Sequence, residues 1–323
     1  MPILKPTRRD LFKLAAIAPA FALPAMARAD VSGPAGAQAA FHRLTIGQAK
    51  ITVVSDGFLD LPTTGLGVNA DRDEVVAFLT AHYLSTSQHY SHTNHVVIET
   101  GDAVVLIDVG SGARFVPTAG RLMANLVSAG IELDAITHVV ITHAHPDHIW
   151  GIRDDFDEPI LPNAEYIIGE AEFTWWMTDG RVNQVPEILQ QFAAGAVTAL
   201  STEGVDWTMV QDGHEVVGGV RLIHTPGHTL GHMSVMVQSD GSQLLITGDA
   251  MTHATINTER PDWVGNNDQE PDLSVTTRKR LLDMAATDRI AVLGYHFPFP
   301  GVGHIMREGA AYRFIPALWR WQG

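Results

Sequence analysis

Four potential metal ligands lie within six consecutive positions of the chain, directly after an apolar segment. Residues 135–141 predict a buried strand, and the sequence HAHPDH follows this strand from residue 143. Side chains two positions apart on an extended chain point to the same side, so His143 and His145 can bind one ion. The proline then turns the chain, which directs Asp147 and His148 to a second position close by. So dense a group of ligands at a strand end predicts a metal site.

Three further candidate ligands occur later in the chain, and each follows another predicted strand. They are His228 in the sequence TPGHTLGH, Asp249 in the sequence TGD and His296 in the sequence GYH. Active sites of layered α/β proteins collect at strand ends, because loops converge there while the sheet keeps them rigid. The repeated placement predicts that these side chains and the histidine-rich segment meet in one site.

Short β-branched segments alternate with turn residues and helical segments beyond residue 40, which is typical of an α/β layer protein. Strands are expected at residues 49–55, 95–99, 104–108, 138–142, 166–168, 220–224, 234–238, 244–247 and 290–294. Helices are expected at residues 71–81, 116–129, 171–177, 185–193 and 273–286. The stretch 58–93 contains one helix and otherwise has the composition of a loop, so we interpret it as a lid or a dimer arm.

The first 29 residues have the composition of an export signal. Residues 7–13 read TRRDLFK, an apolar run covers residues 14–25, and residues 27–29 read ARA, which is typical of a cleavage site. Two prolines interrupt the apolar run, and it is too short to span a bilayer comfortably. We therefore expect a twin-arginine signal peptide at residues 1–29, a flexible mature N-terminus at residues 30–40, and a periplasmic or secreted protein without a stable membrane anchor.

The charge of the chain excludes some partners. Removal of the expected signal takes away five of 21 basic and one of 36 acidic residues, which leaves 16 basic and 35 acidic residues and changes the formal charge from −15 to −19. Nucleic-acid binding is disfavoured, because it needs a basic face that neutralises phosphates. The chain has no cysteine, so disulfides and thiolate ligands are excluded, and metal binding must rest on histidine and carboxylate. A small-molecule substrate is the expected partner.

The pattern of histidines and aspartates resembles the metallo-β-lactamase-fold hydrolase superfamily. The sequences HxHxDH, PGHTLGH and TGD and the late histidine carry the resemblance, which covers roughly residues 96–304. It implies a single domain at residues 41–323, folded as a four-layer αββα sandwich of the α/β class, with a dinuclear metal site at strand ends between the sheets. By motif position, the first metal is expected to bind His143, His145 and His228, the second Asp147, His148 and His296, and Asp249 is expected to bridge the two.

The C-terminal part of the chain narrows the resemblance. Residues 291–304 read AVLGYHFPFPGVGH and residues 312–316 read YRFIP, and both are similar to the branch of methyl parathion hydrolases and quorum-quenching lactonases. The sequence LPNA at residues 161–164 is similar to that branch as well. Asp249 and the absence of a cysteine ligand differ from true β-lactamases, which argues against antibiotic hydrolysis. The branch also implies a homodimer.

The resemblance implies a hydrolase with two divalent metal ions, and the expected signal peptide implies that it is exported. The ions lower the pKa of water, and a bridging hydroxide attacks an electrophilic centre of a small, partly apolar substrate, a lactone or an organophosphate triester. Asp249 and Asp147 are the catalytic candidates, and Asp249 is expected to pass a proton to the leaving group. Zinc suits an imidazole-rich site without cysteine, although manganese, iron or cobalt also bind mixed histidine and aspartate sites.

Three alternative functions stay open at this point. Hydrolytic dehalogenation of activated aromatic compounds would use the same nucleophile. Thioester hydrolysis of the glyoxalase II type shares the sequence PGHTxGH, but the expected export and the absence of an evident basic cluster for glutathione argue against it. A non-catalytic periplasmic metal-binding protein would have no open coordination position.

Several other residues are candidates for a substrate pocket or for structural roles. The pocket candidates are Trp175, Trp176, Phe297, Phe299 and His253. Adjacent aromatic residues on a helix cannot all face one side, so we expect one of the two tryptophans in the core. A structural hydrogen bond is expected for His232 and a structural role for His304. The loop position of His89, His92 and His95 permits a role at the pocket rim, but we expect these three to be bystanders.

Overall fold

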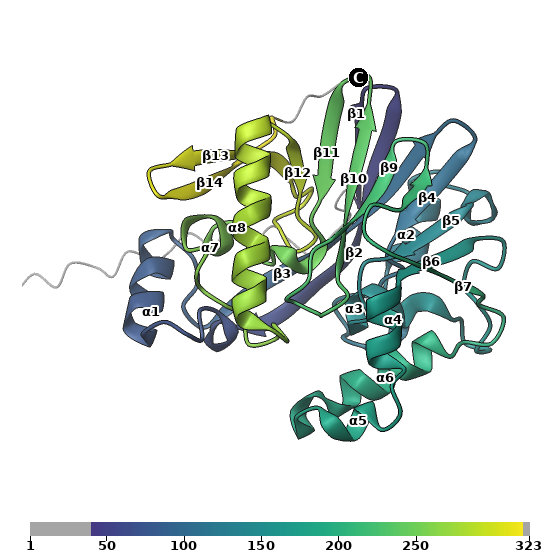
Figure 1. Ribbon diagram of the computed structural model, residues 1–323, viewed down its shortest axis with the longest axis horizontal. Coiled ribbons are helices and arrows are strands. Elements are labelled where there is room, and N and C mark those ends of the chain that lie inside the picture. Colours follow the sequence, from purple (N-terminus) through teal and green to yellow (C-terminus); the bar gives the residue numbers. More distant parts are fainter. Residues whose placement is uncertain (1–39, 319–323) are drawn as a thin grey trace, which may run out of the picture. The chain divides into compact units, whose positions relative to one another are not determined.

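Two seven-stranded β-sheets lie face to face in the computed structural model, which describes residues 40–318 (Figure 1). The first sheet has the order β1 (Phe41–Ile46), β2 (Ala49–Pro62), β3 (Gln88–Thr100), β4 (Ala103–Ile107), β5 (His138–Ile141), β6 (Glu165–Gly169) and β7 (Trp207–Val210). The second has the order β14 (Ala311–Pro316), β13 (Val302–Glu308), β12 (Ala291–Leu293), β11 (Ser242–Ile246), β10 (Met233–Ser239), β9 (Val220–His224) and β8 (Glu215–Val217). The expected signal peptide and most of the expected flexible N-terminus lie outside the described residues.

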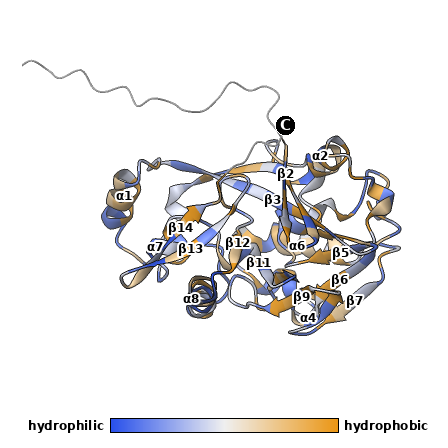
Figure 2. Cartoon of the chain, turned by 90° about the horizontal axis from the view of Figure 1, so that it is seen from above, coloured by the Kyte–Doolittle hydropathy of each residue, from blue (hydrophilic) through white to orange (hydrophobic). Residues whose placement is uncertain are grey.

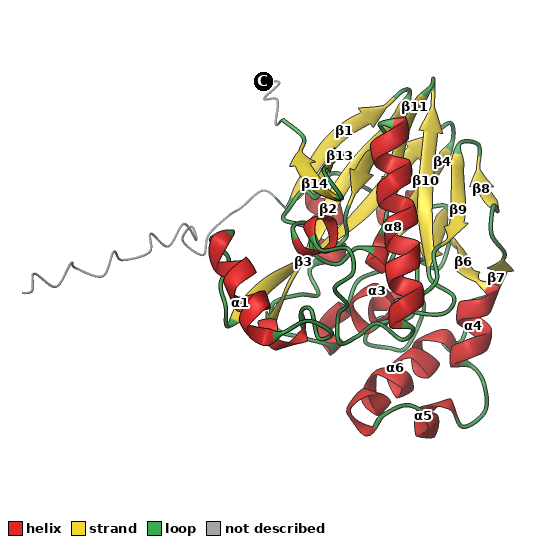
Figure 3. Ribbon diagram, turned by 60° about the vertical axis from the view of Figure 1, so that its left-hand side comes forward, coloured by secondary structure: helices red, strands yellow, loops and turns green. Residues whose placement is uncertain are grey.

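Helices cover the outer faces of both sheets. The helices of the described residues are α1 (Arg72–Ala81), α2 (Leu122–Ser128), α3 (Pro146–Ile149), α4 (Glu170–Trp176), α5 (Arg181–Gln184), α6 (Gln190–Leu200), α7 (Ile256–Glu259) and α8 (Pro271–Asp288). Short 3-10 turns occupy Thr63–Gly65, Gly112–Arg114, Leu133–Ala135, Trp150–Ile152, Glu187–Leu189 and Gly248–Ala250. In Figure 3, α8 lies across the strands of the second sheet, while α4, α5 and α6 lie together beside the first. None of the helices in residues 40–318 is long and apolar enough to span a membrane.

Alternating side chains of the central strands build the cores between these layers. On β5, Val140 lies between the two sheets, while Val139 packs on the helical side with residues of α2 and α6. On β11, Leu244 lies between the sheets, while Leu245 packs toward α8. Figure 2 shows the hydrophobic colour along β5 and β6. Because successive side chains of a strand face opposite sides, such apolar runs need a layer on each face, and the predicted αββα sandwich is confirmed.

In the stretch 58–93, residues 58–62 and 88–93 are β-structure, so the expectation of loop was wrong for these two segments, whereas the single expected helix is confirmed as α1. Strand β2 continues to its end at residue 62, and β3 begins at residue 88, with Phe58 opposite His92 and Pro62 opposite Gln88. Side chains on both faces of this part of the hairpin are partly exposed. Its sequence therefore lacks the alternation of apolar and polar residues that indicates a strand. The expected role of the stretch as a lid or a dimer arm stays a prediction.

Other differences from the sequence expectation have local causes. The strands β1, β7, β8, β13 and β14, which the sequence did not predict, all lie at or next to a sheet edge, where burial gives little pattern. The helix expected at 185–193 begins later, because Pro186 holds Val185 in an extended conformation, and a 3-10 turn at 187–189 leads into α6. The helix expected at 116–129 shortens to α2, since Gly120 takes a φ of 87° before it.

Candidate metal centre

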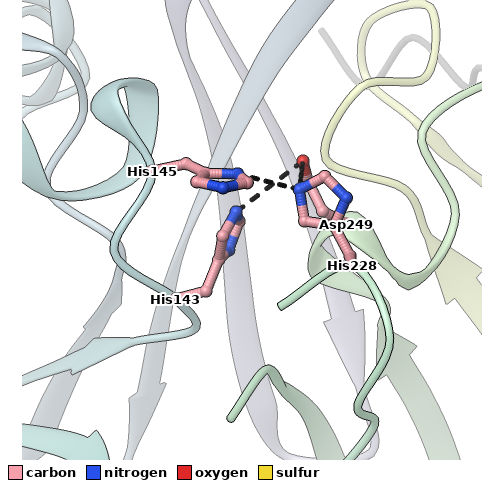
Figure 4. A group of neighbouring side chains, drawn as sticks. All are labelled: His143, His145, His228 and Asp249. Atoms are coloured by element: carbon pink, nitrogen blue, oxygen red, sulfur yellow. Dashed lines mark hydrogen bonds and ion pairs between the residues drawn. The ribbon is translucent and has the colours of Figure 1, made fainter. Parts of the chain in front are cut away.

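Seven histidine and aspartate side chains from both sheets converge between the sheets at the ends of strands. The atoms that can bind a metal lie within 4.8 Å of one another in each of two groups. Figure 4 shows the first group, in which the four side chains point toward a common centre. The first group is His143, His145, His228 and Asp249, and the second is Asp147, His148 and His296. The structure therefore brings together all seven residues that the sequence predicted to meet.

Short loops after strands place these side chains. The first ligand loop, residues 142–148, follows β5, and its proline occupies the first position of α3, which turns the chain between the two groups. The second ligand loop, residues 225–232, connects β9 and β10 and carries His228. Asp249 lies in a 3-10 turn directly after β11, and His296 follows β12.

Asp249 lies between the two groups and contacts both. Its Oδ2 lies 3.1 Å from Nε2 of His228 and 3.8 Å from Nε2 of His143, both in the first group. The same oxygen lies 3.2 Å from Nε2 of His296, and Oδ1 lies 3.4 Å from Nε2 of His148, both in the second group. A single carboxylate within reach of both sets is the arrangement that a bridging ligand requires.

Buried polar atoms without hydrogen-bond partners test whether these residues fit metal ions. In the described part of the chain, His143 Nε2, His148 Nε2, Asp147 Oδ2 and Asp249 Oδ1 are buried and make no hydrogen bond. An unsatisfied buried polar atom costs about 1–3 kcal/mol, and more when it is charged. Cations bound at this centre would supply the missing partners of all four atoms. Imidazole nitrogens and carboxylate oxygens are zinc ligands, so the donor set fits two divalent cations.

The electrostatics of the site supports the same reading. Burial and the neighbouring histidines hold the pKa values of His143 and His145 well below the ordinary value of 6.5, so both imidazoles are neutral and can donate a lone pair. Burial alone would lower the pKa of His228, but the carboxylates of Asp249 and Asp268 outweigh it and raise this pKa to about 9. The carboxylates thus favour positive charge at the centre, which a divalent cation supplies.

Two buried carboxylates orient histidines of the site by accepting hydrogen bonds from the ring nitrogen that faces away from the centre. Nδ1 of His148 donates a hydrogen bond to Oδ2 of Asp108 over 2.8 Å, and Asp108 is itself held by the backbone N–H of Thr142 at 2.7 Å. Nδ1 of His228 donates to Oδ1 of Asp268 over 3.1 Å. These bonds fix which ring nitrogen carries the proton and leave Nε2 facing the centre. Neither aspartate was predicted from the sequence to be a site residue, although Asp108 is the last residue of a predicted strand.

Tyrosine and histidine side chains also support the candidate ligands. The hydroxyl of Tyr295 donates to the backbone oxygen of Asp147 over 2.7 Å, and its ring stacks on His148 with centroids 4.0 Å apart. Sequence reasoning missed Tyr295. The structural hydrogen bond expected for His232 is confirmed, because its Nε2 accepts the backbone N–H of Asp249 at 2.9 Å. Nδ1 of His296 donates to the backbone oxygen of His92 over 2.8 Å, so His92 contributes through its backbone.

Two of the five candidate pocket residues belong to the core instead. Phe297 is fully buried beside Phe314, because the chain turns at residues 294–297 and directs this ring away from the centre. Trp176 is 3% exposed and donates its indole N–H to Glu172, so it is the tryptophan expected in the core. Both assignments to a pocket were therefore wrong.

The other three candidates are half-buried. Trp175 lies under the guanidinium of Arg181, 4.2 Å from the ring centroid. Phe299 lines a cavity of about 360 Å³ beside α7 and β14, and none of the seven candidate ligands lines this cavity. His253 follows the 3-10 turn of Asp249, and its ring centroid lies 5.9 Å from that of His89. The side chain of His304 is exposed on β13. Its expected structural role stays a prediction.

The sequence pattern of the metallo-beta-lactamase superfamily matches residues 91–295, more than half of the chain. The chain therefore belongs to this superfamily. Fold and site define its class as that of the metal-dependent hydrolases.

Individual relatives and solved structures are similar to this chain over most of its length. An N-acyl homoserine lactonase of Bacillus sp is 23% identical over 220 residues, which are 62% of this chain and 79% of that protein. An uncharacterized protein of Mycobacterium bovis is 30% identical over 224 residues, 68% of this chain and 88% of that protein. The dizinc quorum-quenching lactonase AidC, solved with a product, has a TM-score of 0.82 at 22% identity over 87% of this chain and 98% of its own. The hydrolase AbOPH has a TM-score of 0.80 at 24% identity over 88% and 100%.

Proposed function

We propose that this protein is a dinuclear zinc hydrolase that opens the ring of lactones, with N-acyl homoserine lactones as the substrate class. The observation that carries the proposal is the position of Asp249 between two groups of metal-binding atoms in a superfamily whose related members include lactonases. Phosphotriesters are the second candidate, because residues 291–304 resemble the methyl parathion hydrolase branch.

The chain's own residues fit the steps of this reaction. When bound, two divalent cations lower the pKa of water and polarise the carbonyl or phosphoryl oxygen of the substrate. The histidines of both groups would hold the cations, and Asp147 would complete the second group. Ring opening adds the oxygen of water to the carbonyl carbon, breaks the bond between this carbon and the ring oxygen, and delivers a proton to that ring oxygen. A carboxylate oxygen of Asp249 holds the proton in transit.

A side-by-side assay tests the proposal. The zinc-loaded protein is given N-hexanoyl homoserine lactone, an aryl phosphotriester, a chlorinated aromatic compound and a glutathione thioester. We expect the lactone to be hydrolysed with the highest kcat/KM, and the His143→Ala and Asp249→Ala variants to lose this turnover together with metal. A zinc-loaded protein without turnover of any of the four would support a non-catalytic metal-binding role instead. Fastest turnover of the phosphotriester would favour the second candidate.

We also propose that residues 1–29 export the protein to the periplasm or beyond, and that the mature chain acts as a homodimer. The sequence TRRDLFK ahead of an apolar run supports export. Expression of the full chain followed by cell fractionation tests it. Replacement of both arginines by lysine should retain the protein in the cytoplasm, and unchanged export would contradict the proposal. Light scattering on the mature chain tests the dimer.

A further inference from the structure

Glu172 on α4 is fully buried and lies next to both ligand loops, although it faces neither group of metal-binding atoms. Its Oε1 accepts hydrogen bonds from the backbone N–H of Ala144 at 2.9 Å and from the indole N–H of Trp176 at 2.6 Å. Its Oε2 accepts from the hydroxyl of Thr229 at 2.6 Å and from the backbone N–H of Gly231 at 3.1 Å. Three of the four partners are N–H groups that can only donate, and the hydroxyl of Thr229 donates as well. The geometry is that of an ionised carboxylate.

The four partners show what this carboxylate holds in place. Ala144 lies between His143 and His145 in the first ligand loop, and Thr229 follows His228 in the second. One carboxylate therefore joins the two loops that supply all three histidines of the first group.

The contact between α4 and the second ligand loop is close. A Cβ atom on Gly231 would lie 2.0 Å from the backbone nitrogen of Glu172, so only glycine permits this approach. The second ligand loop therefore lies directly against the backbone of α4, next to the Glu172 carboxylate.

The second group is held by different residues. Asp108 orients His148, and the hydroxyl of Tyr295 holds the backbone of Asp147. Among the described residues, Glu172 makes no hydrogen bond to any member of the second group. The carboxylate that bonds the loops beside the first group is therefore not the one that orients His148 of the second group.

We propose that Glu172 is a positioning residue that selectively sets the metal affinity of the first site, by fixing the distance between the two ligand loops. The proposal rests on the metal centre proposed above, but it does not depend on the identity of the substrate. Replacement of Glu172 should release the metal bound by His143, His145 and His228 and leave the second site occupied.

The Glu172→Gln variant tests this in the mature protein. The side chain keeps its size, but its amide group brings N–H donors to a place where four donors already converge. Zinc affinity is measured by competition with a chromophoric chelator, and bound zinc is counted by elemental analysis. We expect the second site to bind zinc as tightly as in the wild type and the first site to be weakened about 10- to 100-fold. Glu170→Gln is the matched control, since Glu170 lies two positions earlier, is exposed and accepts a surface hydrogen bond from Gln211. It should bind two zinc ions as the wild type does.

Two double variants show which of the two metal sites loses zinc affinity when Glu172 is replaced. In a His296→Ala background, Glu172→Gln should also weaken the remaining tight site, whereas in a His143→Ala background it should change zinc affinity by less than about twofold. Thr229→Val removes only one of the four donors and should shift the first site in the same direction by less, which keeps the test available if Glu172→Gln fails to fold. Wild-type affinity in Glu172→Gln, or equal losses in both backgrounds, would overturn the proposal. Neither result depends on turnover, so the lactonase assay is judged separately.

Discussion

Asp268 accepts a hydrogen bond from Nδ1 of His228 at 3.1 Å, and both side chains are buried. Behind this pair, the guanidinium of Arg278 lies 3.4 Å from the second oxygen of Asp268 and is 2% exposed. A candidate metal ligand is thus connected to a buried cation on α8 by one carboxylate. Burial opposes ionisation of Asp268, but His228 and Arg278 outweigh it and hold the pKa of this carboxyl below its ordinary value.

Replacing Asp268 by asparagine should therefore affect both folding and metal binding. Asparagine can still accept the bond from His228, but Arg278 is left as a buried charge without its partner. We expect a loss of about 3 kcal/mol in the free energy of unfolding of the metal-free protein, and zinc affinity about tenfold lower. Urea unfolding and chelator competition measure the two effects. The control is Asp262→Asn, which breaks the exposed pair with Lys279 and should cost less than about 1 kcal/mol. Equal effects of the two variants would contradict this account.

The close approach at Gly231 gives a second prediction. Gly231→Ala places a methyl group against the backbone of Glu172 on α4, which cannot move aside as a side chain can. We expect a loss of about 1–3 kcal/mol in unfolding free energy together with weaker zinc binding. Gly218→Ala serves as the control, because nothing lies within 4 Å of its Cβ position. If both variants unfold at the same urea concentration as the wild type, the loop is not held as the structure indicates.

The sequence predicted the candidate ligands better than their supports. The seven ligands lie in recognisable positions after strands, and a motif with regular spacing reports on local geometry. Glu172 and Asp268 contact residues 57 and 40 positions away, respectively, and nothing in their own surroundings in the sequence marks them. Such contacts follow from how α4 and α8 pack, which local patterns do not encode.

Phe297 illustrates a different limit of sequence reasoning. Its position next to His296 suggested that it lines a pocket. The backbone N–H of Phe297 bonds the oxygen of Gly294, and this turn places the two neighbouring side chains on opposite sides of the chain. His296 joins the metal-binding atoms, while Phe297 enters the core beneath α8. Proximity in sequence to a ligand is therefore a weak guide where the chain turns.

His253 gives a pH dependence that does not involve the seven candidate ligands. Burial and then the neighbouring His89 lower its pKa from 6.5 to about 3. Its Nδ1 accepts the backbone N–H groups of Thr255 and Ile256 at 3.3 and 3.2 Å, so a proton on Nδ1 would break both bonds. The folded protein therefore binds fewer protons than the unfolded chain, and stability is lost as pH falls below 6.5.

We expect this imidazole to contribute a slope of up to about 1.4 kcal/mol per pH unit between pH 6 and 4 in the metal-free protein. In His253→Gln this contribution disappears, so stability should fall less steeply over the same range. Urea unfolding at four pH values measures the slope, with His304→Gln as the exposed control. Identical slopes for wild type and His253→Gln would show that His253 is not held neutral by the fold.

Diffraction at the zinc absorption edge tests the central claim most directly. Crystals of the zinc-loaded protein should give two anomalous peaks per chain, one among His143, His145 and His228 and the other among Asp147, His148 and His296, with ligand distances of about 2.0–2.2 Å. Carboxylate oxygens of Asp249 should lie within that distance of both peaks. A single peak, or an Asp249 that contacts neither, would contradict a dinuclear centre built from these seven residues.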